Sequence, residues 1–457
     1  MIKSTRGDVS EAITGSPLVG APLLPTMLRL AVPGIIGSMI HMLLIIVEIF
    51  LLNRAGTTAL AAVATVFPLV MLAHMLSAGA IGGATSGAVA RALGSSDLLK
   101  SYAILRSAVL IALVGGAVMG VIVTIFGATF FYWVGARGDV LAAANAYAKV
   151  IFFGIPLVWL FNMMCSVLRG AGAMIRSALA MGSVLLVYAV LGFWLIPEQN
   201  TVKSASEIMT TAAYILLVSY GMGILAVFTL ILLPGQPVRF GGFRFDWSLV
   251  AALLRSGLLA GTQSTATIVY SLIATSLLGR FSIDWLAGYG LAVRLELIMV
   301  PVIFGIGSAL IAVVGAYVGA GQRARAIEVA WKGTIANIVI VGTIGLVLAL
   351  NPNWWCGALG GDGVTTHCAT TLEILGPFYG FFAAGLGLYF ASQGLNTLLW
   401  PVLGSLLRAI VVASGLLWLN LDWLTRPDAI LWLVASAMCF YGVFVVLGLR
   451  FSAWRTW

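Results

Sequence analysis

Acidic residues inside apolar stretches are the groups of this sequence best placed to do chemistry. Glu48 lies about four residues inside the end of the first apolar run, Glu296 lies deep in another, and Glu373 begins a third. A charge at the bilayer centre costs about 2.5–3.5 kcal/mol on insertion scales, so a carboxyl group there needs a reason. We interpret Glu48 as a cavity-facing carboxyl group that binds and releases a proton. The simpler alternative is an interfacial pair with Arg54, and we interpret Glu373 as interfacial.

Arg294 stands two positions before Glu296. Residues two apart on a helix point in different directions, so these two cannot neutralise each other and each needs another partner or water. A role in ion coupling and a structural polar contact both remain open for them. His41 precedes Glu48 by seven residues, so both lie on one helix face about 10 Å apart. A water-linked relay between them is one interpretation, and a histidine hydrogen-bonded inside the bundle is the favoured one.

Motifs for metal or enzyme chemistry do not occur. The sequence has no CxxC, HxxxH, HExxH or DDxxD pattern, so we expect no metal site, no catalytic residue and no cofactor. No repeated filter loop indicates a channel. Cys356 and Cys368 flank a glycine-rich segment predicted to be an outer loop, and a disulfide between them is left open.

Composition defines the class of protein. Of 457 residues 61% are hydrophobic and 9% are charged, with a mean hydropathy of +1.09. A soluble fold could not hide this much apolar surface, which excludes soluble enzymes, nucleic-acid binders and disordered chains. A bilayer core needs about 20 apolar residues per helix. Twelve runs qualify, near 28–52, 59–90, 102–133, 140–168, 177–196, 209–233, 248–279, 286–318, 327–350, 369–392, 401–421 and 429–449.

The basic residues predict the orientation. With the N-terminus in the cytoplasm, 17 of the 24 Lys and Arg residues lie on that side, Arg408 among them, and 6 lie outside. Arg294 alone is left within a span. Both termini are then cytoplasmic, and the net charge of +9 reflects this bias rather than an anionic partner.

The twelve runs divide six and six, and the halves are similar at a spacing of about 225 residues. Leu52-Asn53-Arg54, for example, recurs as Leu278-Gly279-Arg280. The prediction is an all-α polytopic membrane protein with twelve transmembrane helices in two pseudo-symmetric six-helix lobes around a central cavity, as in secondary transporters. The predicted divisions are a cytoplasmic tail 1–26, a lobe 27–233, a cytoplasmic linker 234–247, a second lobe 248–450 and a cytoplasmic tail 451–457.

Several motifs occur in a consistent order along the chain. They are Pro33-Gly34, Glu48, Asn53-Arg54-Ala55-Gly56-Thr57-Thr58-Ala59-Leu60-Ala61-Ala62, Ala90-Arg91-Ala92-Leu93-Gly94, Leu168-Arg169-Gly170-Ala171-Gly172, Pro301 and Val318-Gly319-Ala320-Gly321. Together they resemble the multidrug and toxic compound extrusion (MATE) family, in particular its bacterial DinF-like branch. The resemblance implies an antiporter, coupled to protons or sodium ions, that exports amphipathic and often cationic compounds across the bacterial inner membrane. A lipid-linked precursor flippase of the same superfamily is the alternative.

The sequence departs from that family where the coupling ion is concerned. The acid of the first span is Glu rather than Asp, and the second half lacks the carboxylates of sodium-coupled relatives at Gly261–Ala266 and Phe381–Gly387. Sodium prefers several oxygen ligands, so a lone carboxylate favours protons over sodium. We expect the first helix to bend at the hinge Pro33-Gly34 when Glu48 takes up a proton.

Polar and aromatic residues inside the spans are candidates to line the substrate cavity, because aromatic faces suit organic cations. These candidates are Asn162, Tyr188, Gln263, Tyr270 and Tyr379. The expected partners are a small amphipathic substrate and the lipid bilayer, without nucleic acid, and the expected oligomeric state is a monomer.

Overall fold

The computed structural model describes residues 17–196, 204–233, 238–239, 246–359, 362–417 and 426–454. Within these ranges every regular element is a helix. The predicted tail 1–26 and linker 234–247 lie mostly outside the described residues, as does the end of the predicted tail 451–457. Their boundaries therefore stay predictions.

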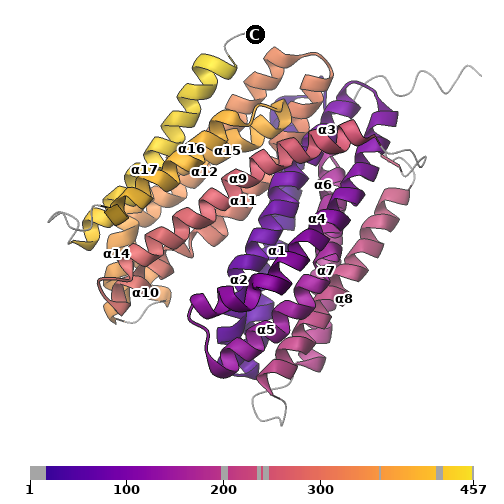
Figure 1. Cartoon of the computed structure of the whole chain (residues 1–457). Helices are drawn as coiled ribbons and strands as arrows, with labels where there is room; N and C mark the ends of the chain where they lie inside the picture. The colour runs from indigo at the N-terminus through magenta and orange to yellow at the C-terminus, as the bar shows by residue number, and fades with distance from the viewer. Residues whose placement is uncertain are drawn as a thin grey trace, which may run out of the picture.

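The first half of the chain forms the lobe drawn in indigo to magenta (Figure 1). Its elements are α1 (Leu23–Ala55), α2 (Thr57–His74), the π-helical segment η1 (Met75–Ala80), α3 (Ile81–Gly94), α4 (Leu98–Trp133), α5 (Gly138–Phe153), α6 (Ile155–Gly170), α7 (Met174–Leu195) and α8 (Ala205–Leu232). Helices α5 and α6 meet at a bend of 52° around Gly154, next to Pro156, which cannot donate a backbone hydrogen bond.

The second half forms the lobe drawn in salmon to yellow (Figure 1). Its elements are α9 (Trp247–Leu278), α10 (Ile283–Val293), α11 (Glu296–Gly319), α12 (Arg323–Leu350), α13 (Asn353–Leu359), α14 (Asp362–Leu375), the 3₁₀ segment η2 (Gly376–Phe378), α15 (Tyr379–Leu395), α16 (Leu399–Leu417), α17 (Pro427–Gly448) and the π-helical segment η4 (Leu449–Ala453).

By length and composition, ten helical stretches in the described ranges could cross a membrane, or eleven if the bent pair α5–α6 is one span. Helix α9 has 32 residues and, at 1.5 Å per residue, a length of about 48 Å, but its polar segment Gly261–Ala266 lowers its hydropathy. If the bent pair α5–α6 and α9 are each counted as one span, the described helices are consistent with the predicted twelve spans. This is a nearly all-helical, multi-span membrane protein.

The buried hydrophobic side chains form two clusters, one for each lobe. One cluster runs from Leu44 to Leu253 and so includes the start of α9. The other follows Ala260 but also includes Leu30, Ala31, Ala80 and Met174. Helix α1 therefore begins against the second lobe and ends inside the first. It packs mainly against α7 of its own lobe and α11 of the other.

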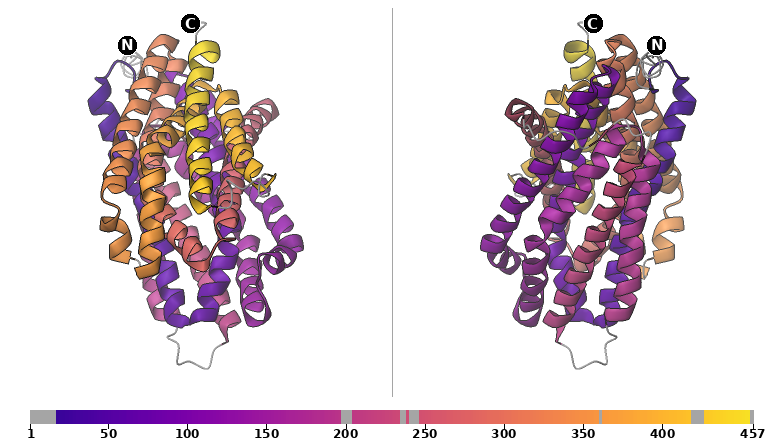
Figure 2. Two further views of the ribbon diagram at one scale, coloured as in Figure 1. Left: turned by 90° about the vertical axis from the view of Figure 1, so that its left-hand side faces the viewer. Right: turned by 90° about the vertical axis from the view of Figure 1, so that its right-hand side faces the viewer.

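Both chain ends lie at the same end of the molecule, which we call the terminal face (Figure 2). In the half of the molecule nearer this face, the lobes touch through glycines. A Cβ atom added at Gly94 would lie 2.2 Å from the carbonyl oxygen of Ala316, and one at Gly319 would lie 2.1 Å from that of Arg91. Only glycine permits this approach of backbones. The predicted hinge belongs to the same interface, since a Cβ at Gly34 would lie 2.9 Å from the carbonyl oxygen of Gly305.

The segment between Cys356 and Cys368 differs from the predicted loop. Its described part is largely helical, in α13 and α14, and the two cysteines form a disulfide with their Cα atoms 5.8 Å apart. The bond ties α13 to α14, which leads through η2 into α15. The question left open by the sequence is thereby answered.

Candidate functional site

The Glu48 carboxyl group lies on α1, seven residues before the helix ends at Ala55. Its Oε1 accepts a hydrogen bond of 2.5 Å from the hydroxyl of Tyr147, a residue of α5 that is 1% exposed. Two more buried tyrosines, Tyr188 on α7 and Tyr220 on α8, lie within electrostatic range of the carboxyl group. Helices α5, α7 and α8 therefore each turn a tyrosine toward one acid of α1.

A second polar group lies two turns earlier on α1. The His41 ring stacks on His74 of α2, with ring centroids 3.9 Å apart. Asn162 of α6, which is 4% exposed, places its Nδ2 3.4 Å from Nδ1 of His74 and donates from the same nitrogen to Ser77 Oγ at 2.9 Å. Because Ser77 lies in the π-helical segment, this group joins α1, α2, η1 and α6.

The histidine group and the carboxyl group are separate in this structure. His41 contacts His74, whereas Glu48 contacts Tyr147, and no hydrogen bond in the described ranges joins the two. The relay therefore stays a prediction. His41 lies inside the bundle as expected, but it is held by stacking on His74 rather than by the expected hydrogen bond, since its Nδ1 has no hydrogen-bond partner among the described residues. Arg54 lies with its guanidinium 5.5 Å from the ring centroid of Phe193, toward the end of α1.

The second lobe holds its own carboxyl group. Glu296 is the first residue of α11, just after the break that follows α10. Tyr270, Tyr289 and Tyr379, from α9, α10 and α15, lie within electrostatic range of it. The hydroxyl of Tyr379 faces the Glu296 carboxyl group, but the two groups are not aligned as in a regular hydrogen bond. The pattern of one acid among three tyrosines thus occurs in both lobes.

One arginine assignment made from the sequence is wrong. Arg408 is expected on the cytoplasmic side, but it lies inside the second lobe on α16 and is 1% exposed. Arg294 is expected within a span, and it lies at the exposed end of α10, inside the candidate span Ile283–Gly319. Counting loop charges misplaces Arg408 because it assigns a basic residue in the first half of a span to the membrane surface.

The cavity candidates do not form one group. Asn162 belongs to the histidine group and Tyr188 to the surroundings of Glu48, whereas Tyr270 and Tyr379 surround Glu296. Gln263 is 4% exposed and its Nε2 lies 3.5 Å from Thr267 Oγ1, in the second lobe. No sequence pattern selects Tyr147, Tyr220 or Thr267, since single tyrosines and threonines are common in spans.

The lobes are also joined by hydrogen bonds near the terminal face. Arg91 of α3 donates from one guanidinium nitrogen to the carbonyl oxygens of Gln393 and Gly394 of α15, at 3.0 and 2.8 Å. In return, Gln393 Nε2 donates to the carbonyl oxygen of Gly79 at 3.0 Å. These bonds and the glycine contacts hold the two lobes together on this side of the molecule.

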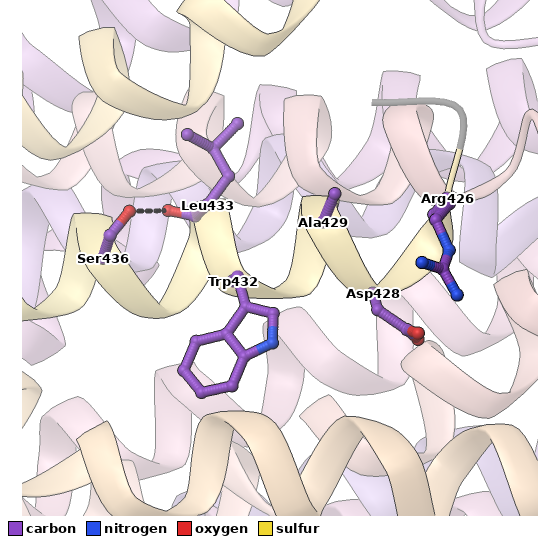
Figure 3. Close-up of a pocket in the computed structure, with 6 residues that line it drawn as sticks. All are labelled: Arg426, Asp428, Ala429, Trp432, Leu433 and Ser436. Carbon is purple, nitrogen blue, oxygen red and sulfur yellow. Dashed lines mark hydrogen bonds between the residues drawn. The ribbon is translucent and has the colours of Figure 1, made fainter. Parts of the chain in front are cut away.

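An open hollow lies at the start of α17 and includes none of these groups (Figure 3). It is lined by Arg426, Asp428, Ala429, Trp432, Leu433 and Ser436. Because its lining belongs to a single helix, it is a surface feature of the second lobe. No group of three or more His, Cys, Asp or Glu in the described ranges could hold a metal ion.

A many-helix membrane protein in two similar lobes, each with a carboxyl group among tyrosines, has the architecture of a secondary transporter. The MatE family model matches residues 33–194 and 260–418, one segment in each lobe. This match covers more than half of the chain, and the chain belongs to the MATE family. It is a membrane transporter and not an enzyme, as the sequence predicted, whereas the DinF-like branch stays a prediction.

Characterised relatives are distant but extensive. The chain is 24% identical over 434 residues to the multidrug export protein MepA of Staphylococcus saprophyticus, covering 90% of this chain and 91% of MepA. It is 23% identical over 313 residues to the FAD transporter of Shewanella oneidensis, with 68% of each chain covered.

Solved structures confirm the fold. A multidrug resistance MATE transporter in an outward-facing conformation superposes with a TM-score of 0.86 at 20% identity, over 96% of this chain and 98% of that one. A MATE structure in the bent conformation gives a TM-score of 0.86, also at 20% identity, over 97% of this chain and 98% of that one. At such identities the similarity concerns the fold alone.

Proposed function

We propose that this chain exports amphipathic, often cationic organic compounds across a bacterial cytoplasmic membrane, in exchange for protons and by alternating access. Both termini would then be cytoplasmic, the terminal face would be the inner side, and the transporter would work as a monomer. The names of its relatives, a multidrug export protein and an FAD transporter, support a small organic substrate without selecting one.

The observation that carries the proposal is the environment of Glu48. Its carboxyl group is held by a tyrosine hydroxyl among side chains that are mostly apolar, on a helix that packs against both lobes. A proton binds to a single carboxyl group, whereas sodium needs several oxygen ligands, usually with more than one formal charge. The described surroundings offer one carboxylate and tyrosine hydroxyls, which suits a proton better.

The position of the hinge supports a route from protonation to movement. Helix α1 contains Pro33, which removes one backbone hydrogen bond, and Gly34, which packs against Gly305 of α11. Ser38 Oγ donates to the carbonyl oxygen of Gly34 at 2.9 Å, a bond that favours bending. A change in the charge of Glu48 alters how the end of α1 packs against α5, α7 and α8, and bending at the hinge would carry this change to the lobe interface.

The test is export from proteoliposomes by wild-type protein and Glu48→Gln, with Glu373→Gln as the matched control. Glu373 is an exposed carboxyl group of α14, so its loss should leave transport unchanged. The proposal expects Glu48→Gln to fold normally and to lose export driven by a proton gradient. Full proton-driven export by Glu48→Gln would contradict it.

A further inference from the structure

Arg408 is a buried cation that the proposed mechanism does not use. It is 1% exposed and stands nine residues after the start of α16, about 14 Å along the helix, which places it well inside the lobe. One guanidinium nitrogen donates to Thr267 Oγ1 at 3.0 Å, and Nε has no hydrogen-bond partner. A charge in such a position needs a counter-charge or a polar environment.

Three aromatic rings surround the guanidinium. Its Cζ lies 4.3 Å from the ring centroid of Tyr270, 5.0 Å from that of Tyr441 and 5.4 Å from that of Phe382. Cation–π contacts of this kind stabilise a desolvated guanidinium. Burying a charge remains costly unless a group of opposite charge lies nearby, so we expect an acidic partner.

Glu296 is the acid that fits this role, because the Tyr270 ring that contacts the guanidinium also lies within electrostatic range of this carboxyl group, as does Arg408 itself. The other acids of this half whose side chains are described lie elsewhere: Asp246, Asp284, Glu328 and Glu373 are exposed, and Asp428 lies at the start of α17. Among the described residues Glu296 and Arg408 do not form a direct ion pair. The Tyr379 hydroxyl faces Glu296 and the Tyr441 hydroxyl faces Gln263, whereas the buried Tyr270 hydroxyl has no hydrogen-bond partner.

The repeat of the fold sharpens the comparison with Glu48. Arg408 stands 220 positions after Tyr188, and Tyr441 stands 221 positions after Tyr220. Tyr188 and Tyr220 come from the fifth and sixth spans of the first lobe and surround Glu48, while Arg408 and Tyr441 come from the fifth and sixth spans of the second. Where the first lobe places a neutral phenol, the second places a permanent cation.

We propose that Arg408 is the fixed counter-cation of Glu296 and so determines that the second lobe binds no mobile coupling ion. The guanidinium repels a sodium ion or proton that would otherwise neutralise the Glu296 carboxylate. Unlike such an ion, the guanidinium is covalently part of the chain and cannot dissociate. Ion coupling is thereby confined to Glu48. This assignment of the coupling ion rests on the proposed function, but the charge pairing itself does not.

The test is a double-mutant cycle on thermal stability in detergent, with wild-type protein, Glu296→Gln, Arg408→Gln and the double variant. Each single change strands one buried charge, so each should lower the melting temperature more than the double change does. The exposed pair Glu328–Lys332, whose Oε1 and Nζ atoms are 2.6 Å apart, is the control and should show additive, near-zero shifts. Additive losses at Glu296 and Arg408 would overturn the pairing. If Arg408→Gln is too unstable to accumulate in cells, normal accumulation of the double variant Glu296→Gln/Arg408→Gln supports the pairing, and the absence of both proteins overturns it.

A second readout tests the exclusion of mobile ions, in a Glu48→Gln background that removes the other carboxylate. The groups that face Glu296 are Tyr270, Tyr289, Tyr379 and Arg408. Arg408→Gln should become more stable on addition of sodium or on lowering the pH from 8 to 6, since either ion then fills the site. Adding Glu296→Gln should abolish that gain. Equal responses with and without Arg408 would overturn the exclusion, and none of these measurements requires transport.

Discussion

The two lobes solve the same problem, a carboxyl group inside the membrane, in different ways. In the first lobe Glu48 is held by the hydroxyl of Tyr147 among tyrosines, whereas in the second lobe Glu296 shares its surroundings with the buried Arg408. A carboxyl group among phenols is neutral only when a mobile cation joins it. A carboxylate beside a fixed guanidinium is already compensated. Two similar lobes can thus each place an acid among tyrosines, on the first span of one lobe and the second span of the other, and still confine ion exchange to one.

The largest effect expected is the loss of coupled export in Glu48→Gln. The amide keeps the size of the side chain and cannot exchange a proton, so active export should fall to the level of empty vesicles. In the second lobe Glu296→Gln should retain export and lose stability instead, which separates the two carboxyl groups by their phenotypes. Transport assays and melting curves on both variants check this, and interchange of the two phenotypes would break the comparison.

A smaller effect is expected from removing the hydroxyl that holds Glu48. Tyr147→Phe deletes a hydrogen bond to a charged group, worth about 1.5–3 kcal/mol, and should lower the export rate roughly tenfold or more. Tyr188→Phe is the matched control, because that hydroxyl has no hydrogen-bond partner among the described residues. Initial rates with a fluorescent organic cation measure both. Equal rates for the two variants would show that the bond to Tyr147 has no part in coupling.

Next in size is the effect of separating the lobes at the terminal face. Gly319→Ala places a Cβ atom 2.1 Å from the carbonyl oxygen of Arg91, so the close contact between α11 and α3 must open. We expect a several-fold loss of export and a longer distance between spin labels at Lys100→Cys and Arg325→Cys, in a background without Cys165 and Cys439. Gly182→Ala, where a Cβ meets nothing within 4 Å, should leave both values unchanged. An unchanged spin-label distance in Gly319→Ala would contradict the assigned interface.

The smallest effect is expected at the exposed start of α9. Asp246 accepts hydrogen bonds from the hydroxyl and N–H of Ser248 and from the N–H of Leu249, and these bonds hold its pKa below the usual value. Because the folded pKa is depressed, the stabilisation is present above the unfolded pKa and is lost as the pH falls through the folded one. Asp246→Ala should therefore lower the melting temperature slightly at pH 7 and not at strongly acidic pH. A difference that is independent of pH would show that the charge of Asp246 is not involved.

Much of the fold could be predicted because hydropathy alone distinguishes membrane spans. Where the spans bend was less accessible: the break at Gly154 and the π-helical segment at Met75–Ala80 depend on packing against neighbouring helices. Helix α9 shows that hydropathy can also understate a span. Its polar residues lower the mean hydropathy, so the helix is harder to recognise as membrane-spanning.

The candidate site was accessible only where a charge interrupts an apolar run. Glu48 and Glu296 were found in this way, and Arg408 interrupts the run near 401–421 just as clearly. It was assigned to the cytoplasm because loop counting treats a basic residue in the first half of a span as near the surface. Tyr147 and Tyr220 were missed since only the tertiary structure brings them to Glu48. Side-chain partners on different helices are set by packing, which one sequence does not encode as a pattern.

The most direct test of the account is export by purified wild-type protein in liposomes under proton and sodium gradients imposed separately. We expect a proton gradient to drive export of a fluorescent organic cation without sodium. We expect a sodium gradient at equal pH, with a protonophore present, to drive none. Export driven by sodium under those conditions would contradict the assignment of Glu48 as a proton site.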